Sequence, residues 1–279
     1  MIDKNDKKAL VERSIITKFR KGIWAPFLQA IKQYRLIKEG DNIAVCISGG
    51  KDSMLLAKLM QELLKHSDYT FGLKFLCMDP GYNGENLQKI KDNAVLLGVP
   101  VQFFQSDVFE AANLVGGDSP CYMCARMRRG YLYARAAELG CNKIALGHHR
   151  SDVIETTLIG MLYGGQIQGM MPRIKSANFE GMELIRPMYC VSEEDILHWR
   201  DYNGLEFIAC ACRFTQKLAE NGQVNSARKR VKELIKELKR DNPDVEKSIF
   251  KSLHNVQLDT LIEYKTGAER HNFLEKFDG

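Results

Sequence analysis

A short glycine-rich segment is the first place where residue types and spacing point to chemistry. It reads Ser48-Gly49-Gly50-Lys51-Asp52-Ser53. An apolar run, residues 43–47, precedes it and a helical pattern follows it. Glycines let the backbone come close to a ligand and adopt positive φ, and a helix N-terminus presents free N–H groups with partial positive charge. The segment therefore predicts a phosphate site, to which the serines add hydroxyl groups and Lys51 adds charge.

Asp52 is the unexpected member of this segment, because a carboxylate repels phosphates unless a cation lies between them. Mg²⁺ bridging Asp52 to the phosphates resolves the conflict. The spacing matches neither Gly-x₄-Gly-Lys-Ser/Thr nor Gly-x-Gly-x-x-Gly, and a tight strand–helix turn without a ligand is the alternative. The string resembles the phosphate loop of enzymes that split ATP into AMP and pyrophosphate. That resemblance implies ATP, Mg²⁺ and transfer of AMP to a substrate oxygen.

Clustered cysteines form the second candidate site. Of eight cysteines, four are grouped, namely Cys121 with Cys124 and Cys210 with Cys212. Two cysteines at i and i+3 can point the same way from one helical turn, and the arginines that follow favour the thiolate. Four thiolates suggest structural zinc, whereas three suggest an iron–sulfur cluster with one open iron. A bound persulfide is a further alternative. The single cysteines, which we interpret as small buried hydrophobic residues, are Cys46, Cys77, Cys141 and Cys190.

The charge is uneven along the chain. The net charge is +5, but residues 1–40 hold ten Lys or Arg against four Asp or Glu, and residues 226–240 hold seven against two. Two basic ends around a weakly acidic centre fit either solvated helix faces or surfaces that hold a polyanion such as RNA. The sequence contains no apolar run that could span a bilayer, and its first eight residues have acids and no apolar core. We therefore expect a cytoplasmic protein.

Strand and helix patterns alternate through the centre of the chain. Apolar strand patterns are followed by helical ones from residue 43 to about 188, which predicts an α/β fold with a parallel sheet and helices on both faces. Asp79 ends the second predicted strand, at the edge where such sheets bind ligands; a turn-capping role is the alternative. We expect a basic helical segment at 1–40, an ATP-binding domain at 41–215 and a basic helical segment at 216–279. The helical segments include 226–240 and 246–264, and no strand is predicted after about 210.

A third motif completes a recognisable set. It reads Gly147-His148-His149-Arg150-Ser151-Asp152. Together with the phosphate loop, the Cys-x-x-Cys-Ala-Arg-x-Arg-Arg-Gly block from Cys121, Tyr163-Gly164-Gly165 and Met171-Pro172, it makes the chain resemble the tRNA 2-thiocytidine synthetase family from about 30 to about 215. The resemblance implies a Rossmann-like PP-loop ATPase fold.

The resemblance also implies site residues. Cys121, Cys124 and one later cysteine would hold a [4Fe–4S] cluster. The family has Cys-x-x-Cys where this chain has Cys-x-Cys, so the third ligand would be either Cys210 or Cys212. Asp152 and Arg128 would act in catalysis with Asp52, and Gly147 and His148 would border the nucleotide. Relatives pair two aspartates where this chain has Ser151 and Asp152. A helix cap for Asp152 and packing for the two histidines are the alternatives.

The implied reaction is ATP-dependent thiolation of tRNA. The C2 oxygen of a pyrimidine, expected to be a cytidine of the anticodon loop, would be adenylated and replaced by sulfur delivered through the cluster. The expected partners are tRNA and a sulfur donor, either a cysteine desulfurase or free sulfide, and relatives suggest a homodimer. The alternatives are a zinc-containing adenylating ligase that joins an amine to a base, as lysidine formation does, and a non-catalytic RNA-binding protein.

Overall fold

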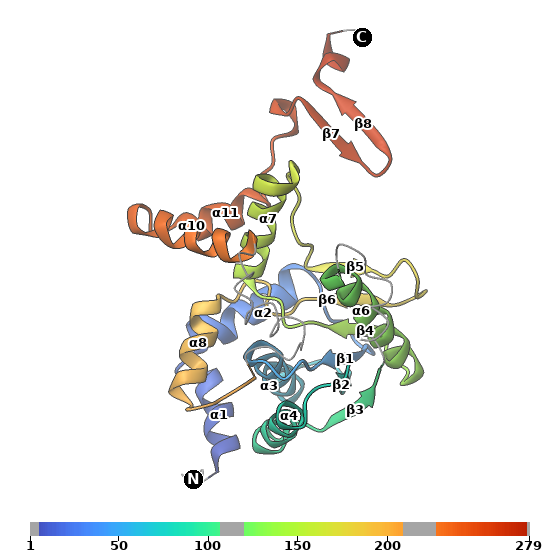
Figure 1. The fold of residues 1–279 in the computed structure, drawn as a ribbon, viewed down its shortest axis with the longest axis vertical. Coiled ribbons are helices and arrows are strands. Elements are labelled where there is room, and N and C mark those ends of the chain that lie inside the picture. The colour runs from blue at the N-terminus through green and yellow to red at the C-terminus, as the bar shows by residue number, and fades with distance from the viewer. Residues whose placement is uncertain (1–5, 107–119, 209–226, 278–279) are drawn as a thin grey trace. The chain divides into compact units, whose positions relative to one another are not determined.

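The computed structural model describes residues 6–106, 120–208 and 227–277. The chain divides into two compact units (Figure 1). The first unit comprises Met1–Val153 with Met170–Ser226, and the second comprises Ile154–Gly169 with Ala227–Gly279. Within the described ranges, no helix is both long and apolar enough to cross a membrane. The division predicted at residues 40 and 215 stays a prediction.

A six-stranded sheet forms the centre of the first unit, in the order β3-β2-β1-β4-β6-β5. The strands are β1 Asn42–Cys46, β2 Gly72–Asp79, β3 Val101–Gln105, β4 Lys143–Ala145, β5 Arg173–Lys175 and β6 Glu183–Ile185. The first four strands and β6 run parallel, as predicted, whereas β5 pairs antiparallel with β6 at the edge. The α/β fold class is therefore confirmed. The strand β5 was not predicted, because its three residues are too few to show a period.

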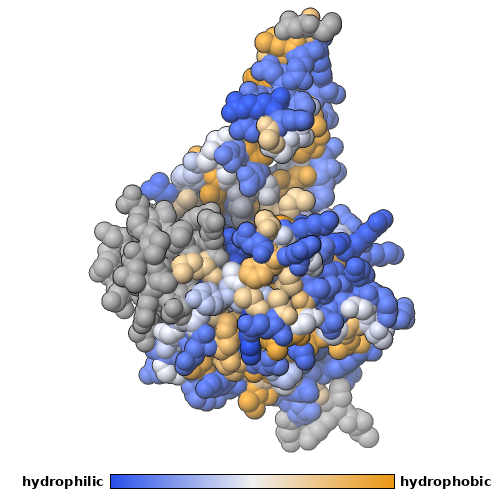
Figure 2. All heavy atoms as spheres, turned by 90° about the vertical axis from the view of Figure 1, so that its right-hand side faces the viewer, coloured by the Kyte–Doolittle hydropathy of each residue, from blue (hydrophilic) through white to orange (hydrophobic). Residues whose placement is uncertain are grey.

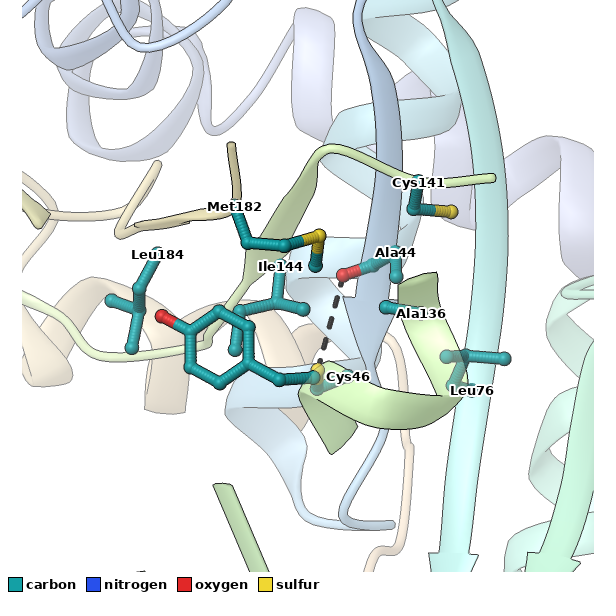
Figure 3. Packing of buried hydrophobic residues seen from close by; sticks show 9 residues of the cluster. Ala44, Cys46, Leu76, Ala136, Cys141, Ile144, Met182 and Leu184 are labelled. Carbon is teal, nitrogen blue, oxygen red and sulfur yellow. Dashed lines mark hydrogen bonds between the residues drawn. The ribbon is translucent and has the colours of Figure 1, made fainter. Parts of the chain in front are cut away.

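Helices cover both faces of this sheet because β1 is apolar on both. Ala44 and Cys46 pack with Tyr133 and Ala136 of one helix (Figure 3). Ile43 and Val45 alternate with them along the strand and are also fully buried. The helices of the first unit that follow its strands are α3 Lys51–His66, α4 Gly84–Leu97, α6 Pro120–Glu138 and α8 Glu193–Tyr202; α7 Arg150–Gly164 begins in this unit and continues into the second. They stand where the alternating pattern predicts helices, and Ser192 caps α8 by accepting a hydrogen bond from Asp195 N–H.

The N-terminal residues pack into the first unit. They form α1 Lys7–Ile16, a π-helical turn Arg20–Trp24, and α2 Ala25–Gln33. Pro26 stands in the first turn of α2, a position where proline is tolerated, whereas inside a helix it is not. Apolar residues such as Ile15 and Phe27 are completely buried.

The second unit corrects one prediction. Its elements after residue 226 are α10 Ala227–Asp241, α11 Val245–Ser252, the 3₁₀ turn Leu258–Thr260, β7 Glu263–Thr266, β8 Glu269–Asn272 and the 3₁₀ turn Phe273–Lys276. The basic helix at 226–240 is confirmed. The expectation of a helix over 246–264 and of no strand after 210 is wrong, because β7 and β8 form an antiparallel hairpin.

Most of the molecular face in Figure 2 is hydrophilic, with scattered hydrophobic patches.

Candidate active site

The phosphate loop connects β1 to α3 and is built as its sequence predicts. Gly49 has φ +83°, and a Cβ there would lie 2.4 Å from Ile90 Cγ1, so conformation and space both require glycine. Ser53 fastens the loop: its Oγ accepts from Ser48 N–H at 3.1 Å and donates to Gly50 O at 3.0 Å. No side chain caps the N-terminus of α3. Its first N–H groups can therefore donate hydrogen bonds to an anion.

Three charged side chains meet beside this loop. Lys51 Nζ lies 3.2 Å from Asp52 Oδ2 and 3.3 Å from Glu193 Oε1. The other carboxylate oxygen of Asp52, Oδ1, is buried and has no hydrogen-bond partner in the part of the chain that the structure describes. A buried carboxylate oxygen without a donor is an unusual feature, and it suits a hard cation such as Mg²⁺, which prefers oxygen ligands. Asp52 thus offers the kind of oxygen ligand that the predicted Mg²⁺ needs.

The loop after β4 lies directly against the phosphate loop. A Cβ on Gly147 would lie 3.1 Å from the backbone carbonyl carbon of Asp52 and 3.2 Å from Ser53 N. Backbone atoms cannot move aside as a flexible side chain can, so this close approach requires glycine. The cause is the strand order: β1 and β4 are neighbours, and the chain proceeds from them in opposite directions across the sheet. Their carboxyl ends form the switch point where open α/β sheets bind ligands.

His149 and Asp152 face Asp52 across this switch point. His149 is 4% exposed, and its Nε2 lies 3.4 Å from Asp152 Oδ2 and 3.7 Å from Asp52 Oδ1. Asp152 Oδ2 also accepts from the backbone N–H of His149 at 3.1 Å. The imidazole therefore stands between two carboxylates, one from each loop. Asp152 has the capping contact that was the alternative, and the same contact holds its carboxylate in the site.

Glu193, in the first turn of α8, is a site residue that was not predicted from the sequence. Its backbone N–H donates to Ser151 Oγ at 3.2 Å, and Arg150 N–H donates to Val191 O at 2.8 Å. These bonds fasten the start of α8 to the start of α7. Ser151 therefore helps to hold a glutamate that reaches Lys51. No local pattern could reveal this contact, because 142 residues separate Lys51 from Glu193.

Arg128 extends from α6 toward the carboxyl ends of β1 and β2. It lies within electrostatic reach of Cys46, Cys77 and Tyr82. Burial raises the pKa of both thiols to about 12, so these cysteines stay protonated and serve as packing residues. Figure 3 shows Cys46 within its apolar cluster, with Sγ directed at Ala44 O, 3.8 Å away. The prediction that Cys46, Cys77, Cys141 and Cys190 are buried is confirmed.

The grouped cysteines are only partly visible. Positions 121 and 124 fall in the first two turns of α6, but their side chains lie outside the described part, as do Cys210 and Cys212 altogether. Among the described side chains, no group of three or more His, Cys, Asp or Glu could hold a metal ion. The predicted ligand set therefore stays a prediction.

The last predicted site residues are Asp79 and His148. Asp79 ends β2, and its Oδ1 accepts from Gly81 N–H at 2.9 Å and Tyr82 N–H at 2.8 Å. That bonding makes it a turn-capping residue at the ligand-binding edge. His148 lies in the β4–α7 loop, but the imidazole between the two aspartates is that of its neighbour His149.

Comparison with known proteins agrees with this geometry. Residues 23–222 match the PP-loop domain family ATP_bind_3. A tRNA-cytidine(32) 2-sulfurtransferase of Geotalea uraniireducens is 35% identical over 92% of this chain and 100% of its own length. One of Vibrio vulnificus is 33% identical over 85% of this chain and 74% of its own.

A solved structure has the same fold. The U34-tRNA thiolase NcsA from Methanococcus maripaludis, with its [4Fe–4S] cluster, superimposes with a TM-score of 0.65 at 19% identity. The match covers 90% of this chain and 83% of that one. Sequence and fold therefore agree: this chain belongs to the tRNA 2-thiocytidine synthetase family of PP-loop proteins.

Proposed function

We propose that this protein is an ATP-dependent tRNA sulfurtransferase that replaces the C2 oxygen of a tRNA cytidine, at position 32, with sulfur. The supporting observation is the arrangement of Asp52, His149 and Asp152 beside the uncapped N-terminus of α3. A nucleotide-binding loop thus stands next to ionisable groups that could act on a second substrate. Relatives that are 33% and 35% identical over 85% and 92% of this chain carry the name of this activity.

The phosphate loop would bind the triphosphate and direct its reaction. The N–H groups of α3 and the ammonium of Lys51 would stabilise the negative charge that develops on the phosphates. Asp52 would hold Mg²⁺, which supplies further positive charge. The C2 oxygen of a splayed-out pyrimidine attacks the α-phosphorus, and the bond to pyrophosphate breaks. His149 and Asp152 would position the base and move its proton.

The second half of the reaction exchanges the activated oxygen for sulfur. A sulfur nucleophile adds at C2, and the bond to AMP breaks, so that C2 keeps sulfur and AMP leaves with the oxygen. Cys121, Cys124 and either Cys210 or Cys212 would hold a [4Fe–4S] cluster, which supplies a Lewis-acidic iron that carries sulfur. Two cysteines three residues apart at the start of α6 suit such a donor set, because residues with this spacing lie side by side on a helix. Arg128, one turn further along α6, faces the carboxyl edge of the sheet.

The experiment that tests this function is nucleoside mass spectrometry of tRNA from a strain that lacks the gene. We expect 2-thiocytidine to disappear and to return when the gene is restored, with sulfur coming from a cysteine desulfurase or from sulfide. Two variants separate the steps. Asp152→Asn should lose thiolation while it still binds ATP. Cys121→Ser, purified without oxygen, should lose iron and thiolation but also bind ATP. Unchanged thiocytidine in the deletion strain would overturn the proposal, and zinc in place of iron would favour the amine-joining ligase.

A further inference from the structure

Arg186 is an unusual charge at the carboxyl edge of the sheet. It follows Ile185, the last residue of β6, and is 5% exposed. Its Nη1 donates to Met171 O, but its Nε is buried and has no hydrogen-bond partner within the described residues. No carboxylate of the described residues lies within ion-pair distance of it. A buried guanidinium normally has a carboxylate or phosphate partner, because removing a charge from water is costly.

The surroundings of Arg186 increase this excess of positive charge. Arg129, Tyr133, Tyr189 and Asp152 lie within electrostatic reach. Arg129, an exposed residue of α6, adds a second cation, and Asp152 is already engaged by His149. Burial lowers the pKa of Arg186 to about 10, so the side chain is still charged at neutral pH. Among the described residues, Asp152 is the carboxylate that faces these two arginines, and such an excess of positive charge favours an anion.

The position of this place in the fold separates it from the phosphate loop. β6 is the neighbour of β4 on the side away from β1. The triphosphate site at the end of β1 already has the N-terminus of α3, Lys51 and Asp52. Arg186 therefore lies beyond β4 from the triphosphate site, with Arg129 and Asp152 within its electrostatic reach, and we place the acceptor of the proposed reaction on this side. The acceptor nucleotide of an RNA carries a phosphodiester on each side of its ribose.

We propose that Arg186 and Arg129 form a second phosphate subsite, which binds a phosphodiester of the RNA that flanks the nucleotide to be modified. This inference rests on the proposed function in taking RNA as the acceptor. The buried Nε and the fork of the guanidinium are suited to a phosphate oxygen. The exposed Arg129 and the buried Arg186 would hold that phosphate partly withdrawn from water. The subsite would fix the depth to which the target base enters the crevice.

Binding of unmodified tRNA by single variants is the first test. Arg186→Met and Arg129→Ala should each weaken tRNA binding by about tenfold or more and reduce the slope of log affinity against log salt by about 0.7 to 0.9, the value for one phosphate contact. ATP affinity should not change. The controls are Arg135→Ala, an exposed arginine of the same helix paired with Glu138, and Arg173→Met, which is paired with Glu183. Both should bind tRNA as the wild type does.

A neutral linkage in the RNA makes the test specific. A tRNA with one methylphosphonate next to the target nucleotide should bind the wild type more weakly, whereas Arg186→Met should show no further loss, because the same interaction is already absent. Wild-type tRNA affinity in Arg186→Met overturns the inference. So does weaker ATP binding with unchanged tRNA binding, which would assign the phosphate to the nucleotide.

Two further points keep the outcome decisive. Arg129 is exposed, so Arg129→Ala decides the question with the same modified tRNA if Arg186→Met does not fold. Binding is measured without turnover. A wild type that makes no thiocytidine but shows these arginine effects would refute the proposed function and leave the subsite standing, and thiolation without the arginine effects would do the reverse.

Discussion

The carboxylate of Asp52 is energetically unfavourable beside a phosphate site unless a cation binds next to it. Its Oδ2 accepts a hydrogen bond from the ammonium of Lys51 at 3.2 Å, whereas its Oδ1 is buried and has no hydrogen bond among the described residues. A buried acceptor without a donor costs free energy, and a negative charge beside a phosphate site repels the ligand. Both costs are removed when a cation lies between the carboxylate and the phosphates. We therefore expect Asp52 to favour metal-bound ATP over free ATP.

Replacing Asp52 with asparagine tests this preference. Asp52→Asn keeps the size of the side chain and removes its charge. We expect the affinity for ATP in Mg²⁺ to fall and thiolation to decrease about 10²-fold, the usual cost of removing one electrostatic interaction with the reacting group. ATP affinity measured in EDTA should be unchanged or higher, because a repulsive charge is gone. Equal losses with and without Mg²⁺ would contradict the metal-binding role.

Gly147 allows a second prediction at the residue scale. The Cβ of Gly147→Ala would press against the backbone of Asp52 at 3.1 Å, so the β4–α7 loop must shift and carry His149 with it. A displacement of about 1 Å can cost about 10²-fold in rate. We expect thiolation to fall by at least tenfold while the melting temperature changes little. Gly84→Ala is the matched control, since nothing lies within 4 Å of its added Cβ; a similar loss in that variant would remove the geometric explanation.

At the scale of elements, strand order explains why much of the site could be predicted. The motifs follow β1 and β4, and an alternating strand–helix pattern makes the carboxyl ends of such strands meet. Glu193 and Arg186 could not be predicted. Glu193 lies in a normal helix-capping sequence, and Arg186 lies in a mixed segment, so only the packing of α8 and β6 against other elements gives them partners. Their positions depend on contacts between segments far apart in the chain.

The β7–β8 hairpin was missed for a different reason. Period-two patterns arise when one face of a strand is buried, but none of the hairpin residues is buried. Tyr264 and His271 stack across the two strands at 4.8 Å between ring centroids, and Gly267, with φ +63°, turns the chain between them. A charged ribbon with one aromatic pair has almost no hydrophobic signal. The helical expectation came from the preceding residues, where α11 does exist.

The attachment of α1 to α3 gives a pH-dependent prediction. Lys58 is completely buried, and its Nζ lies 2.6 Å from Glu12 Oε1. Burial raises the pKa of Glu12, but hydrogen bonds from Lys58 and Lys65 outweigh burial, so this pKa lies below 4.5. A lowered carboxyl pKa in the folded state stabilises the fold above pH 4.5, and this contribution is lost as pH falls through the folded pKa.

We therefore expect Glu12→Gln to reduce the free energy of unfolding by about 2 kcal/mol at neutral pH, the size of a charged hydrogen bond. The difference from the wild type should shrink toward zero as the pH falls well below 4.5. Urea unfolding at a series of pH values measures both quantities. Glu138→Gln, which loses an exposed pair with Arg135, should change stability by less than about 1 kcal/mol at any pH. A difference that does not depend on pH would show that the Glu12 charge is not responsible.

At the scale of the whole molecule, the two basic segments serve different purposes. The N-terminal segment contributes apolar side chains to the packing of the first unit, with Val11, Ile15 and Ile23 completely buried. In the second unit, α10 turns Val231 and Ile235 toward Ile154, so its basic residues face away from that small core. Glu155 forms ion pairs with two of these basic residues: its carboxylate oxygens lie 3.5 Å from Arg228 Nε and 3.5 Å from Lys232 Nζ. The basic residues of α10 that remain exposed include Lys229, Arg230, Lys236 and Arg240.

The exposed face of α10 should contribute to tRNA affinity through charge alone, which makes its effect dependent on salt. In a double variant, Lys229→Gln with Arg230→Gln, tRNA binding should weaken at low salt, and the slope of log affinity against log salt should fall by about 0.7 to 0.9 for each phosphate that the variant no longer neutralises. Because α10 holds no reacting group, thiolation at saturating tRNA should keep its wild-type rate. The matched control is Lys74→Gln with Lys91→Gln, two exposed lysines of β2 and α4. If both pairs change the slope equally, the tRNA responds to net charge and α10 has no specific role; if neither does, the basic face of α10 is a solvated helix surface.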